Sequence, residues 1–301
     1  MAGSKKSVFL INFEYDESEL GDELKSLLEN DDVAIFSATA GSFALDFGGD
    51  ENNNKILFRG SVVSSSNSIF FIRKRSKKYT FLSSLLSRFL QRNNYTFLNP
   101  LFSEHQKSIG KFAQGINLSA KGYLVPRTII VSSDNIAEYK DYIEKVMSYP
   151  LVIKGSGSGG NAVWKVSGWE EVESAVQTGI ERIKDAVMFQ EFIPQSQEEY
   201  RLVFFAGEMV ASVRRASSDF YNNYAQGATV STYDVPEEER QVCCEIALQS
   251  DLDYVAVDYM KNESGQMVFM EVQTGPSLDV SKIANPEVVQ SIAEAFRKKF
   301  L

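Results

Sequence analysis

Residues Leu252 to Leu278, LDYVAVDYMKNESGQMVFMEVQTGPSL, place acidic and amide side chains along two strand-like runs that a turn connects. The turn is Asn-Glu-Ser-Gly at 262–265, residue types that favour reversal of the chain. Strict alternation puts one set of first-run side chains on a shared face: Tyr254, Ala256 and Asp258. In the second run it predicts the same for Met267, Phe269, Glu271 and Gln273. Asp258 and Glu271 can therefore converge across a hairpin, with the oxygen of Gln273 beside them.

Oxygen ligands of this kind suit Mg²⁺, which prefers one or two carboxylates together with phosphate oxygens. The alternative is an ordinary half-buried hairpin whose acids are solvated, and composition alone favours that alternative. The rest of the chain is needed to decide between the two interpretations.

Composition bounds the class of protein. The chain has 301 residues, of which 44% are hydrophobic, enough for a substantial core and two or three lobes. A net charge of −9 argues against nucleic acid as a partner. The first apolar run ends at Phe13, too short for a signal sequence or a membrane span, so we expect a cytoplasmic protein without a membrane partner. The adjacent Cys243 and Cys244 fit neither a disulfide nor a zinc site, and the single His105 argues against histidine-based chemistry.

The N-terminal third predicts an α/β fold. Strand patterns at 7–13 and 33–36 flank a helical pattern at 18–30, and such a βαβ opening starts a doubly wound parallel sheet. No G-x-G-x-x-G follows Phe13, so a dinucleotide site lacks its phosphate loop. We expect residues 40–54, rich in Gly, Asn and Asp, to form a surface excursion. Further elements are expected as strands at 55–59, 68–73 and 95–98 and as a helix at 81–92.

A basic run interrupts this acidic chain. It contains Arg73, Lys74, Arg75, Lys77 and Lys78. The run is either a solvated connection or a binding surface for an acidic peptide, and the residues themselves leave both interpretations open.

A glycine-rich loop is the second specific signal. A strand at 149–154 ends in Lys154, the sequence GSGSGG follows at 155–160, and a second strand is expected at 162–166. Backbone N–H groups of such a loop can close over phosphates, and Lys154 adds a positive charge. The lysine precedes the glycines, so the pattern is not a Walker A motif. A mobile hairpin turn is the alternative.

Polar residues punctuate the remaining elements. Helical patterns are expected at 103–121, at 133–148 with Ser133 as the cap, and at 169–179, and a strand at 187–193 contains Gln190-Glu191-Phe192-Ile193. Two runs at 199–205 and 209–215 predict a hairpin that carries Arg201 and Arg215. The polar loop 219–227 contains Asn223, whose amide could lie near the acidic pair.

The order of these motifs resembles the ATP-grasp superfamily, and most closely its branch with the ribosomal-protein glutamate ligase. The resemblance rests on the lysine with its glycine loop, Gln-Glu-Phe-Ile, Glu199-Tyr200-Arg201, Arg215, Asn223, Asp258 and Glu271-Val272-Gln273. It covers about residues 100–280, and its motifs are specific jointly rather than singly. Gln273 stands where the family has Asn, and Tyr221-Asn222 stand where that ligase has Arg and Ser.

The resemblance implies roles for individual residues. Lys111 and Lys154 would contact ATP phosphates, under a lid that includes Ser156, Gly157, Gly159 and Gly160. Glu191 and Phe192 would read the adenine edge, with Gln190 and Ile193 also in the nucleotide site, and Glu199 would hold the ribose. Asp258, Glu271 and Gln273 would hold Mg²⁺, with Asn223 nearby. Arg201 and Arg215 would hold an acyl phosphate or the substrate carboxylate, so the implied catalytic set is Arg201, Arg215 and Lys154.

The implied reaction is activation of a carboxylate by ATP, followed by attack of an amine or hydroxyl on the acyl phosphate. Preorganised positive charge suits that chemistry, and a closed lid would exclude water from the intermediate. The fold implied is an ATP-grasp fold behind an N-terminal α/β domain. We expect an N-terminal domain at 1–105, a lid subdomain with the glycine loop at 106–190, and a C-terminal subdomain with the Mg²⁺ site at 191–301.

The N-terminal third carries a finer resemblance, to the graspetide (microviridin-type) peptide maturases, which cross-link a ribosomally made precursor peptide through side-chain carboxylates. It rests on Phe70-Phe71-Ile72-Arg73-Lys74, Phe97-Leu98-Asn99-Pro100, Lys111-Phe112-Ala113-Gln114 and the turn Gly122 to Thr128. The resemblance implies a precursor peptide as partner, contacted by Arg73 and Lys74. A homodimer is a further expectation that does not come from the resemblance. Two alternatives stay open: a glutamate or amino-acid ligase, and a non-catalytic ATP-binding or peptide-binding module.

Overall fold

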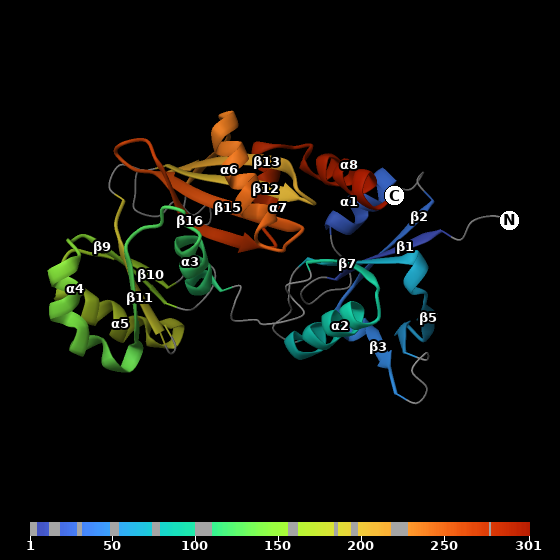
Figure 1. Ribbon diagram of the computed structural model, residues 1–301, viewed down its shortest axis with the longest axis horizontal. Helices are drawn as coiled ribbons and strands as arrows, with labels where there is room; N and C mark the ends of the chain where they lie inside the picture. The colour runs from blue at the N-terminus through green and yellow to red at the C-terminus, as the bar shows by residue number, and fades with distance from the viewer. Residues whose placement is uncertain are drawn as a thin grey trace.

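The computed structural model describes residues 5–11, 19–28, 32–48, 54–73, 79–99, 110–155, 162–183, 186–193, 198–217, 228–276 and 278–301. Helices and strands alternate along the chain, and most of the strands form three main sheets, which confirms the expected α/β class. Figure 1 shows the N-terminal sheet on the right, the sheet of β12 to β16 at the top centre, and β9 to β11 with their helices on the left.

The N-terminal sheet has the order β2-β1-β6-β7, with every pair parallel. Its elements are β1 (Lys6–Ile11), α1 (Glu19–Leu28), β2 (Val33–Ala38), β6 (Ser68–Ile72), α2 (Thr80–Arg92) and β7 (Thr96–Leu98). Its central strands are buried throughout their apolar stretches, as expected for a parallel sheet covered on both faces. The βαβ opening predicted from the sequence is confirmed.

The surface excursion expected at 40–54 is wrong for its first half. There the chain forms η1 (Ala40–Ser42) and β3 (Phe43–Asp46). β3 pairs with β4 (Lys55–Phe58), which pairs with β5 (Ser61–Val63), and η2 (Ser65–Asn67) leads into β6. The reason is aromatic packing, because the ring centroids of Phe43 and Phe58 lie 5.5 Å and 5.0 Å from that of Phe9.

A second sheet, in the order β10-β9-β11-β8, carries the strand that ends beside the glycine loop. Its elements are β8 (Thr128–Ser132), η5 (Ser133–Tyr139), α4 (Lys140–Val146), β9 (Leu151–Gly155), β10 (Val163–Val166), α5 (Trp169–Ile183) and β11 (Ala186–Glu191). The single helix expected at 133–148 is wrong, because Asn135 has non-helical torsions and the segment starts as a 3₁₀ helix. The cap is Ser132, whose side chain accepts from the Asp134 N–H, and not Ser133.

The third sheet has the order β14-β13-β12-β15-β16 and is antiparallel. Its strands are β12 (Glu198–Phe205), β13 (Glu208–Ala216), β14 (Thr229–Thr232), β15 (Tyr254–Lys261) and β16 (Met267–Thr274). The helices around it are α3 (Lys111–Ala120), α6 (Glu237–Leu248), α7 (Leu278–Ala284) and α8 (Val288–Phe300). Both predicted hairpins are confirmed. None of the helices in the described part of the chain combines the length and hydropathy that crossing a bilayer requires.

The alternation expected along the last hairpin is only partly correct. Asp258 pairs with Glu271 as predicted, but Tyr259 pairs with Phe269, so the register shifts by one residue. This bulge turns Phe269 to the face that carries Val272, and both pack in one apolar cluster. Met267 and Phe269 therefore do not share the face of Glu271.

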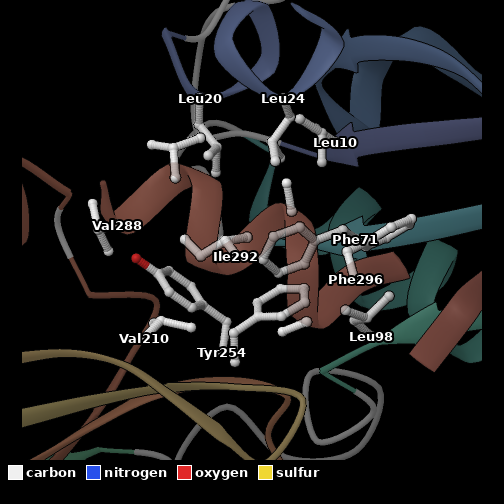
Figure 2. Close-up of a cluster of buried hydrophobic side chains, with 14 of the residues drawn as sticks. Leu10, Leu20, Leu24, Phe71, Leu98, Val210, Tyr254, Val288, Ile292 and Phe296 are labelled. Atoms are coloured by element: carbon white, nitrogen blue, oxygen red, sulfur yellow. The ribbon is translucent and has the colours of Figure 1, made fainter. Parts of the chain in front are cut away.

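One face of this third sheet is apolar at one end. Val203, Phe205, Tyr254 and Ala256 join a core with the N-terminal sheet, and α8 supplies Ile292 and Phe296 to it (Figure 2). Beyond this core the same alternation on β12 and β15 continues into Arg201 and Asp258. The core therefore fixes the N-terminal sheet against the sheet that carries these charges.

Asn99 links the two sheets by hydrogen bonds. Its Nδ2 donates to the Ile72 carbonyl (2.6 Å), and its Oδ1 accepts from the N–H groups of Asp253 (2.9 Å) and Tyr254 (3.0 Å). Asn99 is fully buried, and its φ of 63° lies in the left-handed region that Asn tolerates better than most residues.

Asn99→Ala is expected to lower the free energy of unfolding by roughly 2–4 kcal/mol, because it strands buried backbone groups on both sheets. Urea denaturation measures this loss. Asn99→Gly is the control, because glycine relieves the torsional strain but not the lost hydrogen bonds. If Asn99→Gly is as stable as the wild type, the side-chain bonds do not matter.

Candidate active site

A row of charged side chains crosses three neighbouring strands. Arg201 on β12 pairs with Asp258 on β15, which pairs with Glu271 on β16. The Arg201 guanidinium binds the carboxylate with both Nε (2.7 Å to Oδ1) and Nη2 (2.6 Å to Oδ2). Arg201 is 7% exposed and Asp258 2% exposed, so this bidentate pair is buried.

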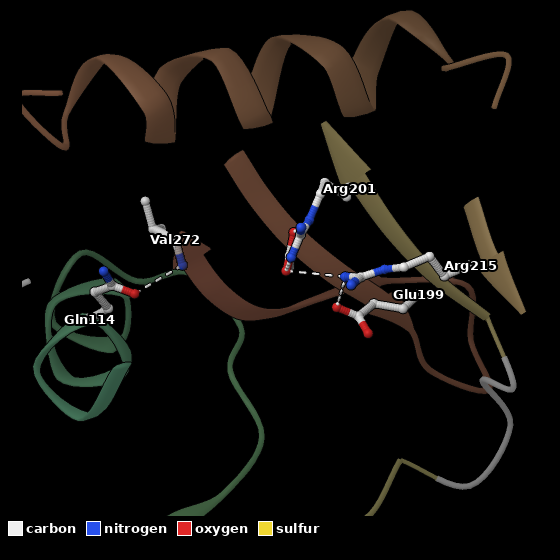
Figure 3. A network of polar contacts seen from close by, with 6 residues as sticks. Gln114, Glu199, Arg201, Arg215 and Val272 are labelled. Atoms are coloured by element: carbon white, nitrogen blue, oxygen red, sulfur yellow. Dashed lines mark hydrogen bonds and ion pairs between the residues drawn. The ribbon is translucent and has the colours of Figure 1, made fainter. Parts of the chain in front are cut away.

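A second arginine completes the cluster. Arg215 on β13 lies opposite Glu199 on β12. Its Nη2 donates to Glu199 Oε1 and also to Asp258 Oδ2, 3.2 Å away. Figure 3 shows Arg201, Arg215 and Glu199 converging in front of the sheet. Two guanidiniums thus face two carboxyl groups, and such pairing compensates the cost of burying charge.

The environment shifts the acidity of both carboxyls. Burial by itself raises the pKa of Asp258, but the guanidiniums of Arg201 and Arg215 outweigh it and hold that pKa below its usual range. For Glu199, burial raises the pKa by more than the guanidinium of Arg215 lowers it. The negative charge of Asp258 raises it further, to about 7. Asp258 is therefore the firmly ionised member of the cluster.

The oxygen donors beside this cluster fit Mg²⁺ in their chemistry. Glu271 is half-buried across from Asp258, and Gln273 follows on the same strand. The Oε1 of Gln273 is buried without a hydrogen-bond donor among the described residues, and a cation would satisfy it. Asp258 already accepts from two guanidiniums. No group of three or more His, Cys, Asp or Glu side chains suited to a metal occurs in the described ranges, so phosphate oxygens would have to complete the shell.

The lysine beside the glycine loop is oriented by its own sheet. Lys154 Nζ donates to Gln190 Oε1 (2.6 Å), and Gln190 Nε2 donates to Thr128 Oγ1 (3.2 Å). These residues lie on β9, β11 and β8. Gln190 is 5% exposed, so its side chain holds Lys154 in place from inside the sheet.

The segment expected to read adenine begins at the end of β11, an interior strand of this sheet. Glu191 is exposed and donates its N–H to the Arg127 carbonyl (2.9 Å), and Ile193 is half-buried. Lys165 Nζ lies 4.1 Å from the centroid of the Phe192 ring. Lys165 could not be identified from the sequence, because a single lysine in a strand is indistinguishable from a surface charge.

The structure brings together some of the predicted site residues and leaves others undescribed. Arg201, Arg215, Glu199 and Asp258 form one cluster, although Glu199 was expected apart from it, on a ribose. Arg73 follows β6 and donates its N–H to the Ile11 carbonyl (3.2 Å). The remaining predictions lie outside the described residues: Lys74, Ser156, Gly157, Gly159, Gly160, Asn223 and the side chain of Lys111.

Gln114 makes a contact with the strand of Glu271 that was not predicted from the sequence. Its Oε1 accepts the N–H of Val272 on β16 at 3.2 Å, which joins α3 to the strand of Glu271 (Figure 3). The sequence signals for Gln114 are its place one helical turn after Lys111 and its part in the motif Lys111-Phe112-Ala113-Gln114, and neither indicates a bond to Val272.

Comparison with known proteins places this chain in a family that agrees with the resemblance seen in its sequence motifs. Residues 111–296 match the family model described as RimK-like ATP-grasp domain. A probable alpha-L-glutamate ligase of Psychromonas ingrahamii is 30% identical over 187 residues, 60% of this chain and 60% of that protein. The match therefore spans less than two thirds of that relative's length.

Two solved structures share the fold over nearly the whole chain. The ATP-grasp ligase PsnB, complexed with a phosphomimetic variant of minimal precursor, Mg and ADP, has a TM-score of 0.71 at 15% identity and covers 97% of this chain and 98% of its own. The macrocyclase MdnC of Microcystis aeruginosa, bound with precursor peptide MdnA, has a TM-score of 0.67 at 15% identity, covering 97% and 100%.

Proposed function

Because the chain belongs to the RimK-like ATP-grasp family, we propose that it joins a carboxylate to an amine or hydroxyl. The carboxylate takes the γ-phosphoryl group of ATP, which leaves ADP and an acyl phosphate, and attack of the amine or hydroxyl then releases inorganic phosphate. ATP-grasp ligases use ATP and Mg²⁺, and the PsnB complex contains Mg and ADP. In this chain Glu271, Gln273 and Asp258 would hold the Mg²⁺, which neutralises charge on the phosphates when bound.

One observation carries the assignment of the reacting centre. The Nε of Arg215 is buried and has no hydrogen-bond partner among the described residues. A buried guanidinium donor without an acceptor is costly, and an oxygen of a substrate carboxylate or acyl phosphate would satisfy it. Asp258 and Glu199 fix the orientation of the same guanidinium, so it is preorganised for a developing negative charge.

For the substrate we propose a graspetide-type peptide maturase, which forms side-chain ester or amide cross-links in a ribosomal precursor peptide. Two features support it: the N-terminal sheet and the ATP-grasp part together follow the fold of ligases solved with precursor peptides, and in the sequence the basic run at 73–78 comes directly after β6 of this sheet. A glutamate ligase is the second candidate, favoured by the 30% identical relative.

The test is to incubate the protein with ATP, Mg²⁺ and a peptide encoded beside it, and to record masses. A cross-linking ligase removes one water from the peptide for each link. A glutamate ligase instead adds glutamate residues when glutamate is supplied. If neither product forms and no ADP is released, the non-catalytic binding module becomes the better interpretation.

The basic run separates the two candidates. Changing Arg73, Lys74, Lys77 and Lys78 together to Ser is expected to weaken peptide binding and to flatten its salt dependence. Each exposed contact contributes about 0.2–1 kcal/mol and is screened by salt. ADP affinity should not change, because Lys111 and Lys154 lie in other segments. The measurement is the peptide KM at low and high salt, and an unaltered KM at both would favour the small-substrate ligase.

The wider organisation also remains a proposal. We propose an N-terminal domain at 1–105, a lid subdomain at 106–190 and a C-terminal subdomain at 191–301, in a cytoplasmic protein that could pair as a homodimer. α3 lies within the proposed lid range but packs on β16 of the C-terminal sheet, so the hinge would fall after this helix.

A further inference from the structure

Strand β16, which carries Glu271 and Gln273, lies at the edge of its sheet among the described strands. An edge strand has a row of backbone groups that no neighbouring strand satisfies. The N–H of Val272, between the two proposed ligands, is one of them, and it donates to the side chain of Gln114. Gln114 is 8% exposed and Val272 6% exposed, so water does not compete well for this bond.

The contacts between α3 and β16 are otherwise mostly apolar. Leu118 of α3 packs in one cluster with Phe269 and Val272, and in the segment just after the helix the ring of Tyr123 meets that of Phe269 edge to face at 5.6 Å. Apolar contacts hold a helix against a strand but are non-directional, so they do not fix how far it slides or rotates. Two hydrogen bonds fix this position. The Val272 N–H donates to Gln114 on α3, and the Phe269 N–H donates to the Leu124 carbonyl in the segment after α3 (2.8 Å).

We infer that Gln114 is a positioning residue for the Mg²⁺-nucleotide site: it fixes the backbone between Glu271 and Gln273 relative to α3. The inference rests on the proposed function. α3 begins at Lys111, one turn before Gln114, so the Gln114 bond is the one of the two that ties the start of this helix to the backbone between both candidate metal ligands. The bulge beside Glu271 makes this more important, because the ladder to β15 is irregular there.

The experiment measures equilibrium binding of ADP to the full-length protein while Mg²⁺ is titrated, which needs no turnover. Gln114→Met keeps the length and apolar contacts of the side chain but removes the acceptor. We expect the Mg²⁺ concentration for half-maximal ADP binding to rise about 10- to 100-fold, the range typical of residues that orient metal ligands. ADP binding without Mg²⁺ should not change. Gln114→Glu keeps an acceptor oxygen and should recover much of the wild-type response.

Two further variants separate positioning from general loosening. Leu118→Ala removes apolar contact from the same face of α3 but leaves the Gln114 bond intact, so it should lower the melting temperature without shifting the Mg²⁺ midpoint. Gln114→Asn keeps the amide but is one methylene too short, and it serves if Gln114→Met does not fold. In a Glu271→Ala background, Gln114→Met should have no further effect on the Mg²⁺ response.

The inference is overturned if Gln114→Met or Gln114→Asn is folded and responds to Mg²⁺ as the wild type does. It is also overturned if Leu118→Ala shifts the midpoint equally. These results differ from a failure of the proposed function, in which Mg²⁺ would leave ADP binding by the wild type itself unchanged and both proposals would fall.

Discussion

Replacing Glu271 with alanine is expected to abolish ADP release with the true substrate while leaving the protein folded. The side chain is half-buried and lies across from Asp258, so its removal takes away a like charge from that neighbour. It also takes away a favourable influence on Arg201. Because these effects oppose each other, the free energy of unfolding should change by less than about 1 kcal/mol.

The measurement pairs an ADP-release assay with urea denaturation. Glu263→Ala is the matched control, because Glu263 is an exposed acid in the turn of the same hairpin. This control should keep both activity and stability. ADP release by Glu271→Ala at the wild-type rate would show that the metal assignment is wrong.

Arg201→Met is expected to lower the free energy of unfolding by about 3–5 kcal/mol, the loss typical of a buried ion pair with one partner removed. Asp258 would stay buried, and Arg215, 3.2 Å away, would be its remaining guanidinium partner. Arg214→Met is the control on the neighbouring position. Arg214 and its partner Glu198 are 44% and 36% exposed in their side chains, so that pair should contribute no more than about 1 kcal/mol.

The double variant Arg201→Met with Asp258→Leu separates stability from function. Apolar residues of similar size often replace a buried ion pair without loss, so much of the stability should return in denaturation experiments. ADP release should not return, because the site has lost a guanidinium and a carboxylate. If the double variant were active, the charged cluster would be a structural ion pair and the reacting centre would lie elsewhere.

Local sequence patterns determined much of this fold. The βαβ opening followed from two apolar runs around an amphipathic segment. The hairpins at β12–β13 and β15–β16 followed from alternation around Ala206-Gly207 and around residues 262–265. The convergence of Asp258 and Glu271 across this hairpin was predicted too, but their direct pairing also requires the bulge, because the register of Tyr259 with Phe269 alone would place Asp258 opposite Met270. The RimK-like ATP-grasp family followed from motifs whose order is specific.

The tertiary structure decided which of these side chains become partners in hydrogen bonds and ion pairs. Arg201 donates hydrogen bonds to Asp258, 57 positions away in the sequence, and Gln114 accepts the N–H of Val272, 158 positions away. Such contacts depend on packing between sheets and helices, and no periodicity within one segment encodes them. The bulge that turns Phe269 away from Glu271, and the aromatic packing that makes a strand of residues 43–46, arise in the same way. Local alternation sets the face of a side chain, and non-local packing sets its partner.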